Sequence, residues 1–259
     1  MAIYHCKVKV LKKARSIIAA IAYRIKDALE DLVTGKVWDY RQGQQDLLWE
    51  FWLKPPECKY TTRQEVWNAV EAAERRRNAR TAREILVAIP AELTQEKQIE
   101  LVYRFATELQ IRYKTVVDVA VHKGYQQRNP HAHILMPTRE IDILTGKFGK
   151  KLRVLDDLKT GPEEIKWIRQ RWEELANEYL PPDKRIDCRS LQDKGILRPP
   201  QPHYGPALVN IERRTGEKSQ KRIAYEQECK IWERIEKRLE FVERKLGSKR
   251  TCGLSHELE

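Results

Sequence analysis

The sequence predicts an α+β fold with a central antiparallel sheet of about five strands flanked by helices. Three observations lead to this class. Two runs rich in β-branched residues, 115–122 and 131–138, are separated by the turn-forming segment KGYQQRN, as in a β-hairpin with a longer loop. Other short apolar runs end at prolines, which is typical of strands. Longer stretches with helical periodicity and capping signals alternate with them. We expect the helices to lie on one face of the sheet.

The first strand and helix are expected near the N-terminus. Residues Ala2–Val10 alternate in character and predict a strand. The stretch Ala14–Leu32 is rich in good helix formers, and it predicts one helix that ends at the TGK of residues 34–36. Alanines surround Tyr23 in this stretch and would let its backbone approach a sheet closely. The apolar segment Asp46–Leu53 predicts the next strand, because a pair of prolines follows it.

The middle of the chain alternates between helix and strand signals. Thr62 and Glu65 form a capping-box pattern and predict a helix to about Arg80. The segment Glu84–Ile89 predicts a strand, and Thr94 opens a helix that we expect to end near residue 113.

The C-terminal part changes in character after the predicted hairpin. Residues 143–153 (ILTGKFGKKLR) are expected to form a basic loop, and Pro162 begins a helix through Tyr179. We therefore predict a folded domain over residues 1–180, a proline-rich connector over 181–206 and a charged, helical extension over 207–259.

Composition bounds the class of partner and the cellular environment. The chain has 259 residues and a formal net charge of +12, so a polyanion such as nucleic acid is the expected partner, although charge alone leaves an anionic membrane surface open. No apolar run is as long as a membrane span, so we expect no membrane insertion. The five scattered cysteines form no C-x-x-C pair, which favours a reducing cytoplasm.

The predicted hairpin carries three of the six histidines, in the pattern H-x8-H-x-H. Side chains alternate along a strand, so His131 and His133 point to the same face, and His122 ends the partner strand on a face shared with Asp118. Three imidazoles that leave coordination positions open suit a divalent metal that takes part in a reaction. With a basic protein, the natural substrate is a phosphodiester, attacked either by metal-bound water or by a side chain.

Four segments, taken in order, resemble the MobA/MobL relaxases, which are histidine–hydrophobic–histidine (HUH) endonucleases of plasmid mobilisation. They are RSIIAAIAYR…TGKVWDYRQG, NARTAREILVAIPAELT, VAVHKGYQQRNPHAHILM and HYGPALVNIERR, and they cover about residues 1–215. The resemblance implies an HUH-type relaxase fold, with residues 1–180 as the nicking domain. His131-Ala132-His133 matches the HUH element and His122 the third metal ligand.

The same resemblance assigns Tyr23 as the nucleophile. In this family the phenolate attacks one phosphodiester at the nick site of an origin of transfer, which gives a 5′-phosphotyrosine link and a free 3′-hydroxyl. That link keeps the energy of the cleaved bond, so the strand can be rejoined without ATP. A phenol with a pKa near 10 is only about a thousandth ionised at pH 7 and needs a base or a charged neighbour. Tyr40 is the rival nucleophile, and we expect it to support Tyr23 or contact DNA.

Glu84 matches an acidic position beside the active site of relatives. We expect it either to hydrogen-bond a ligand histidine or to help accept the tyrosine proton. Relatives often carry another acid where this chain has Leu86, and Asp118 is a candidate replacement.

Several cationic and aromatic residues are candidates for DNA contact. The basic runs would follow phosphates, and aromatic rings could stack on unpaired bases, although packing is the favoured role of Trp38. The candidates are Arg24, Tyr40, Arg76, Arg77, Tyr125, Lys150 and Lys151.

The resemblance thus predicts a bacterial cytoplasmic relaxase that uses Mg²⁺ or Mn²⁺. It implies origin-of-transfer DNA, accessory relaxosome proteins and a type IV secretion coupling protein as partners. Three alternatives stay open: an HUH replication initiator or transposase, a three-histidine hydrolase that uses metal-bound water, and a non-catalytic module that binds single-stranded DNA.

Overall fold

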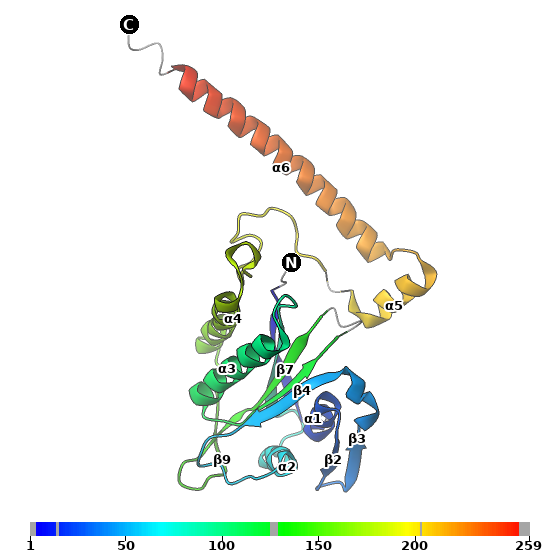
Figure 1. Ribbon diagram of the computed structural model, residues 1–259, viewed down its shortest axis with the longest axis vertical. Helices are drawn as coiled ribbons and strands as arrows, with labels where there is room; N and C mark the ends of the chain where they lie inside the picture. Colours follow the sequence, from blue (N-terminus) through cyan, green and yellow to red (C-terminus); the bar gives the residue numbers. More distant parts are fainter. Residues whose placement is uncertain (1–3, 14–15, 125–128, 203, 254–259) are drawn as a thin grey trace. The chain divides into compact units, whose positions relative to one another are not determined.

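The computed structural model describes residues 4–13, 16–124, 129–202 and 204–253 (Figure 1). Its strands are β1 (Cys6–Lys12), β2 (Ala28–Asp31), β3 (Lys36–Asp39), β4 (Leu47–Leu53), β5 (Arg80–Ala88), β6 (Val117–His122), β7 (His131–Pro137), β8 (Arg139–Ile141) and β9 (Phe148–Lys151). Its α-helices are α1 (Ile17–Ile25), α2 (Arg63–Ala73), α3 (Gln95–Tyr113), α4 (Thr160–Tyr179), α5 (Gly205–Thr215) and α6 (Gln220–Gly253), with short 3₁₀ helices η1 (Arg41–Asp46) and η3 (Pro182–Lys184).

Five of these strands form one antiparallel sheet in the order β1-β5-β7-β6-β4, which confirms the predicted fold class. The prediction that helices lie on one face is wrong. On one face, α3 and α4 pack through residues such as Phe105 and Trp172, and on the other face α1 and α2 pack through Ile21 and Trp67 (Figure 1). The three central strands are largely buried on both faces, so a layer of helices covers each face.

The predicted histidine hairpin is confirmed. Strand β6 pairs antiparallel with β7, and His122 lies opposite His131 in the register. Alternation then places Ala132 and Ile134 in the core against α3 and α4, whereas the histidines face the side of α1 and α2. The pleat therefore places all three histidines on the face that α1 and α2 partly cover.

The helix predicted over residues 14–32 is shorter than expected. It ends at Lys26, which adopts the left-handed conformation with φ 54°. The next residues, Ala28–Asp31, pair with β3 as a hairpin, and Leu29 is buried against the side of α1. Burial of Leu29 in this hairpin outweighs the helical propensity of the ALEDL segment.

Two further predictions are partly correct. The capping box of Thr62 and Glu65 is present, but α2 ends at Ala73, before the arginine-rich run. Residues 143–153, expected as a loop, include strand β9, which pairs with β8. Glycine at position 146 permits the connecting turn, because its φ of 66° would strain other residues.

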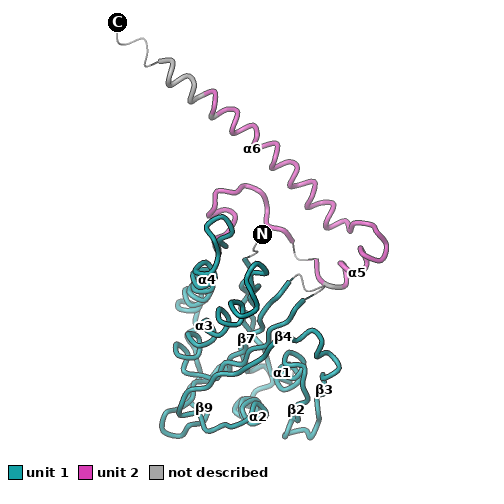
Figure 2. The backbone as a smooth tube through the Cα atoms, viewed as in Figure 1, with its two compact units in different colours: residues 1–188 teal, residues 189–259 magenta. Residues whose placement is uncertain are grey.

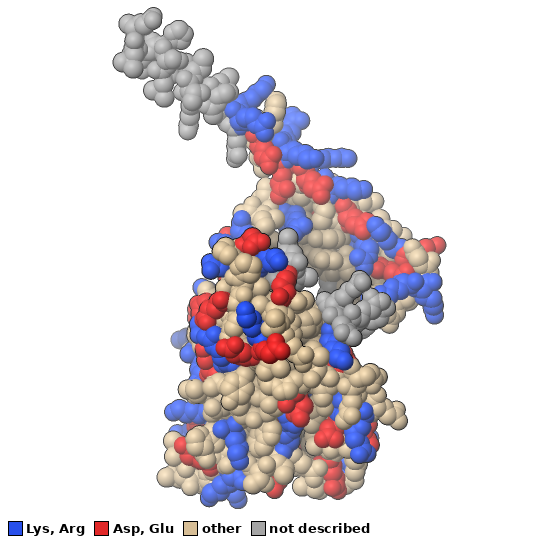
Figure 3. All heavy atoms as spheres, in the orientation of Figure 1, with Lys and Arg blue, Asp and Glu red and all other residues tan. Residues whose placement is uncertain are grey.

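The chain divides into two compact units, residues 1–188 and 189–259 (Figure 2). The first holds the five-stranded sheet. The second includes α5 and α6, and its described charges of both signs are interspersed along α6 (Figure 3). The predicted boundaries at 180 and 206 stay predictions. Among the described residues, no helix is long and apolar enough to cross a membrane.

Candidate metal centre and active site

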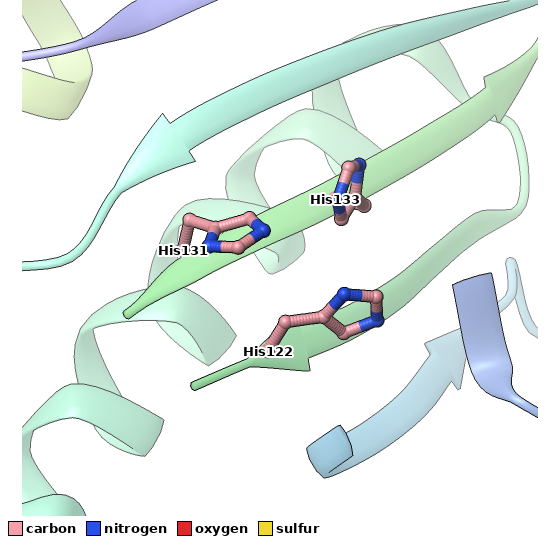
Figure 4. A group of neighbouring side chains, drawn as sticks. All are labelled: His122, His131 and His133. Atoms are coloured by element: carbon pink, nitrogen blue, oxygen red, sulfur yellow. The ribbon is translucent and has the colours of Figure 1, made fainter. Parts of the chain in front are cut away.

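The hairpin brings the three predicted histidines together on one face of the sheet (Figure 4). Each offers a ring nitrogen, and these nitrogens lie within 4.8 Å of one another. The ring centroids of His122 and His133 are 5.0 Å apart, and those of His131 and His133 are 5.2 Å apart. In the described part of the chain, this is the one cluster of three or more such side chains with metal-ligand spacing.

Each histidine uses its other nitrogen to hold its ring in place. His122 Nε2 lies 2.7 Å from the backbone oxygen of Arg24, and His131 Nδ1 lies 2.8 Å from that of Asn129. His133 Nδ1 lies 2.6 Å from Glu84 Oε1. A ring nitrogen that donates to an oxygen leaves the opposite nitrogen with a lone pair. The lone pairs are therefore on His122 Nδ1, His131 Nε2 and His133 Nε2.

Glu84 connects the histidine cluster to helix α1. Its side chain is 1% exposed and accepts a hydrogen bond from Arg24 Nε at 2.8 Å as well as from His133. The ammonium of Lys9, on strand β1, lies 3.6 Å from its other oxygen. Burial acts to raise the pKa of Glu84, but the hydrogen bonds from His133 and Arg24 hold it well below its usual range. Glu84 is thus a carboxylate at neutral pH and a weak proton acceptor.

Burial favours the neutral form of His122 and His133. It lowers the pKa of His122 to about 4, even though the hydrogen bond to Arg24 acts in the opposite direction. Burial also lowers the pKa of His133, against the effect of Glu84. Metal ligation requires neutral imidazoles, so both rings are in the binding form at neutral pH.

Tyr23 lies on helix α1, directly before Arg24. Arg24 contacts both His122 and Glu84, so α1 is held at the histidine cluster. The Tyr23 side chain is 52% exposed, and its ring meets that of Tyr40 edge-on, with centroids 5.4 Å apart. The ammonium of Lys26 lies 3.9 Å from the centroid of the Tyr23 ring. The nucleophile predicted from the sequence is therefore accessible and held by an aromatic ring and a cation.

Lys26 is a functional candidate that the sequence reasoning missed. It is 7% exposed and has a positive φ, which is unusual for a residue other than glycine. Among the described residues, no carboxylate forms an ion pair with its ammonium. A residue other than glycine with a positive φ is found preferentially at functional positions, and this one contacts the Tyr23 ring. Its place directly after the tyrosine-bearing helix was the available signal.

Asp46 is a second residue near the histidine cluster that the sequence did not predict. Its Oδ2 lies 3.5 Å from His122 Nδ1, and its backbone oxygen accepts a hydrogen bond from Lys123. It stands far from the histidines in the sequence, and it was interpreted only as the first residue of a strand. An acidic residue at a strand end has no motif of its own, so only the folded chain reveals its neighbour.

Asp118 shares the histidine face, as predicted, but contacts other residues. Its carboxylate accepts hydrogen bonds from Arg63 Nε at 3.1 Å and Trp67 Nε1 at 2.8 Å. Burial raises its pKa to about 6, and the Arg63 charge opposes this rise. These contacts with α2 give Asp118 a structural role. Leu86 lies directly opposite His133, so no second carboxylate occupies that position.

The predicted DNA-contact residues fall into two groups. Arg24 and Tyr40 lie at the histidine end of the sheet through the contacts described above. Exposed Arg76 and Lys150 lie towards the other end, where Lys151 instead binds Glu74 at 2.9 Å. Further predicted residues are Arg77, which is exposed, and Tyr125, which lies outside the described residues.

A surface hollow of about 580 Å³ lies beside Arg76 and Lys151. Its lining is mostly basic or polar and includes Arg75, Arg76, Asn78, Arg139 and Lys151. Trp38, by contrast, is partly buried against the side of α1 and packs as predicted.

The chain is similar in sequence to known mobilization proteins. Over 262 residues the chain is 36% identical to the mobilization protein MobL of Acidithiobacillus ferridurans, spanning 88% of this chain and 68% of that protein. It is 30% identical over 258 residues to the probable mobilization protein MobA of Bifidobacterium longum, spanning 83% of this chain and 45% of that protein.

The fold has a solved counterpart as well. A structure from work on the molecular basis of vancomycin resistance transfer in Staphylococcus aureus matches with a TM-score of 0.61 and 28% identity, covering 76% of this chain and 96% of that one. The model of the MobA/MobL family matches residues 15–214. The resemblance found in the sequence is confirmed: the chain belongs to the MobA/MobL family.

Proposed function

We propose that this chain nicks one strand of DNA at a plasmid origin of transfer, with Tyr23 as the nucleophile and a divalent metal bound by His122, His131 and His133. Membership of the MobA/MobL family makes it a DNA relaxase of mobilisation. The residue roles and the metal are our assignment. One observation carries it: Arg24 joins the nucleophile's helix to the histidine cluster through both its carbonyl and its guanidinium.

The residues fit a divalent metal by their donor chemistry. Three ring nitrogens with lone pairs converge, and the other nitrogen of each ring is hydrogen-bonded and orients it. Burial keeps His122 and His133 neutral. Three histidine ligands leave further positions for a phosphate oxygen. A metal bound here would supply Lewis-acid stabilisation of the phosphoryl charge. Mg²⁺ and Mn²⁺ are the expected ions.

The chain's own residues perform the bond exchange. The Tyr23 oxygen attacks phosphorus, an O–P bond forms, and the bond to the 3′-oxygen breaks; the leaving oxygen gains a proton and becomes a free 3′-hydroxyl. The phenol proton passes to solvent, to which Tyr23 is open. Lys26, above the ring, stabilises the negative charge that develops on the phenol oxygen. Tyr40 limits the orientations of the ring by its edge-on contact.

Of the two roles considered for Glu84, the contacts favour orientation of His133. A carboxylate with its pKa well below the usual range, and with Arg24 and His133 already bonded, has little tendency to accept a proton. Its negative charge also makes His133 a stronger metal ligand.

Origin-of-transfer DNA is the proposed substrate, and it fits the net charge of +12. Accessory relaxosome proteins and a secretion coupling protein are the further partners proposed for the complete system. A replication initiator or transposase would use the same chemistry, so only the DNA target distinguishes it. A metal-water hydrolase or a binding module differs in the chemistry itself.

A denaturing gel tests the proposal. The protein is incubated with Mn²⁺ and labelled single-stranded oligonucleotides from its candidate origin. We expect a labelled band that migrates with the protein for wild type and for Tyr40→Phe, and none for Tyr23→Phe or His133→Ala. Cleavage by Tyr23→Phe without linked DNA would support the hydrolase. Binding without cleavage by the wild type, with and without Mn²⁺, would support the binding module.

A further inference from the structure

The Asp46 carboxylate and the His122 ring face one another through two electron-rich atoms. Asp46 Oδ2 lies 3.5 Å from His122 Nδ1, and His122 Nε2 is engaged with the backbone oxygen of Arg24 at 2.7 Å. A backbone oxygen only accepts hydrogen bonds, so the ring proton is on Nε2 and Nδ1 carries a lone pair. A carboxylate oxygen opposite a lone pair is unfavourable unless a cation lies between them.

We propose that Asp46 is the fourth protein ligand of the metal centre, which makes the site three histidines and one carboxylate. This rests on the proposed metal binding by the histidines. At bond lengths of about 2.1 Å, two ligands of one ion lie about 3.0 Å apart in octahedral and about 3.4 Å apart in tetrahedral geometry. The observed separation of 3.5 Å therefore fits two neighbouring ligands of one ion.

Local structure fixes the position of Asp46. It is the last residue of η1 and precedes β4, whose Leu47 is the register partner of His122. The backbone amide of Lys123, next to His122, donates to the backbone oxygen of Asp46 at 2.9 Å. The register then shifts between Leu47 and Trp49, and such bulges re-aim side chains next to active sites. The backbone of Asp46 is thus held beside the cluster.

The composition of the site has a chemical consequence. A carboxylate adds one negative charge and a hard oxygen donor, which favours Mn²⁺ or Mg²⁺ more than three imidazoles alone would. A simple ion pair is the competing explanation of the contact. It would require a charged His122 ring that is 4% exposed and lies beside two further imidazoles.

Mn²⁺ binding to the full chain, followed by electron paramagnetic resonance, is the first test. Asp46→Asn keeps the size of the side chain, and we expect it to weaken Mn²⁺ binding about 10- to 100-fold. Asp39→Asn is the matched control, because Asp39 has a similar exposure and pairs with Arg41, and no contact with a histidine is found for it in the described part of the chain. Equal affinity of Asp46→Asn and wild type would overturn the inference. Failure of the wild type to bind Mn²⁺ would overturn the proposed metal centre with it.

A ligand exchange tests direct coordination. In Asp46→Cys loaded with Co²⁺, a sulfur ligand produces a thiolate-to-cobalt charge-transfer band, which we expect to be absent in Asp39→Cys and in wild type. Co²⁺ binding by Asp46→Cys without that band would show that residue 46 is not a ligand. Neither readout depends on nicking, so loss of this inference is distinguishable from loss of the proposed activity.

Discussion

His133 is oriented from the neighbouring strand by Glu84, with Nδ1 of the ring 2.6 Å from Oε1 of the carboxylate. Glu84 lies on β5 and His133 on β7, and sheet pairing fixes the distance between them. The same carboxylate accepts from Arg24 of α1. One buried acid therefore sets the direction of the His133 ring, a proposed metal ligand, and holds helix α1, which carries Tyr23.

The Glu84→Gln variant is expected to weaken Mn²⁺ binding about 10- to 100-fold, because a neutral amide orients His133 less strongly and lowers its basicity. Isothermal titration calorimetry measures the change. Glu57→Gln, at an exposed position, is the control. Unchanged affinity in Glu84→Gln would contradict the orienting role.

Lys26→Met is expected to slow formation of the covalent adduct about tenfold, with little change in affinity for an uncleavable oligonucleotide. Methionine keeps the length of the side chain and removes the charge above the Tyr23 ring, a contribution of about 1.4 kcal/mol. Lys36→Met is matched, because Lys36 lies 3.6 Å from the Trp38 ring in a similar contact. Equal single-turnover rates for Lys26→Met and wild type would refute the electrostatic role.

Acidification is expected to destabilise the metal-free protein through His122. Burial lowers the pKa of this ring to about 4, so between about pH 6.5 and 4 the unfolded chain binds a proton that the folded chain does not. The free energy of unfolding therefore decreases as the pH is lowered through this window, by up to about 3 kcal/mol.

Urea denaturation of wild type and His122→Gln at several pH values measures this effect, and the variant should show the weaker fall. Asp118, whose pKa burial raises to about 6, acts in the opposite direction in both proteins and cancels in the comparison. Identical pH dependence in the two proteins would show that His122 is not responsible.

Asp118→Asn is expected to lower the free energy of unfolding by about 1–3 kcal/mol, because Arg63 loses a buried anionic partner. Affinity for Mn²⁺ should stay at the wild-type value, in contrast to Glu84→Gln. Urea denaturation and metal titration on the same sample separate the two effects. A weaker metal site in Asp118→Asn would restore the interpretation of Asp118 as a partner of the histidines.

Replacement of Arg76 and Arg77 together by glutamine is expected to weaken binding of all DNA sequences similarly. If each contacts one phosphate, the slope of log affinity against log salt falls by about 0.7–0.9 per residue. Fluorescence anisotropy at several salt concentrations gives this slope. Lys151→Met should instead mainly affect stability, since Lys151 pairs with Glu74. An unchanged slope in the arginine variant would exclude those contacts.

The sequence was sufficient for the histidine cluster because its spacing lies within one hairpin. Strand alternation alone places His131 and His133 on one face, and antiparallel pairing within the hairpin brings His122 opposite His131. The antiparallel sheet of about five strands was likewise predictable from local patterns, namely short apolar runs bounded by turn residues. Long-range contacts such as that of Asp46 with His122 have no local pattern, so they appear only in the folded chain.

The errors share a physical cause. The segment after Lys26 has helix-forming residues, yet it forms β2 because Leu29 is buried in a hairpin with β3. The second helical layer was missed because Ile21 and Trp67 cover a face that also carries polar residues. In both places tertiary burial outweighs the local signal.

The double contact of Arg24 has a consequence for protein engineering. Its carbonyl holds His122 and its guanidinium holds Glu84, which in turn holds His133. The backbone pairing of β6 with β7 closes this chain of contacts into a circuit that joins α1, β5, β6 and β7. A redesign that moves the tyrosine to accept a different backbone geometry would also rotate two histidine rings. Retargeting such a protein to new origins is therefore better attempted in residues outside this circuit.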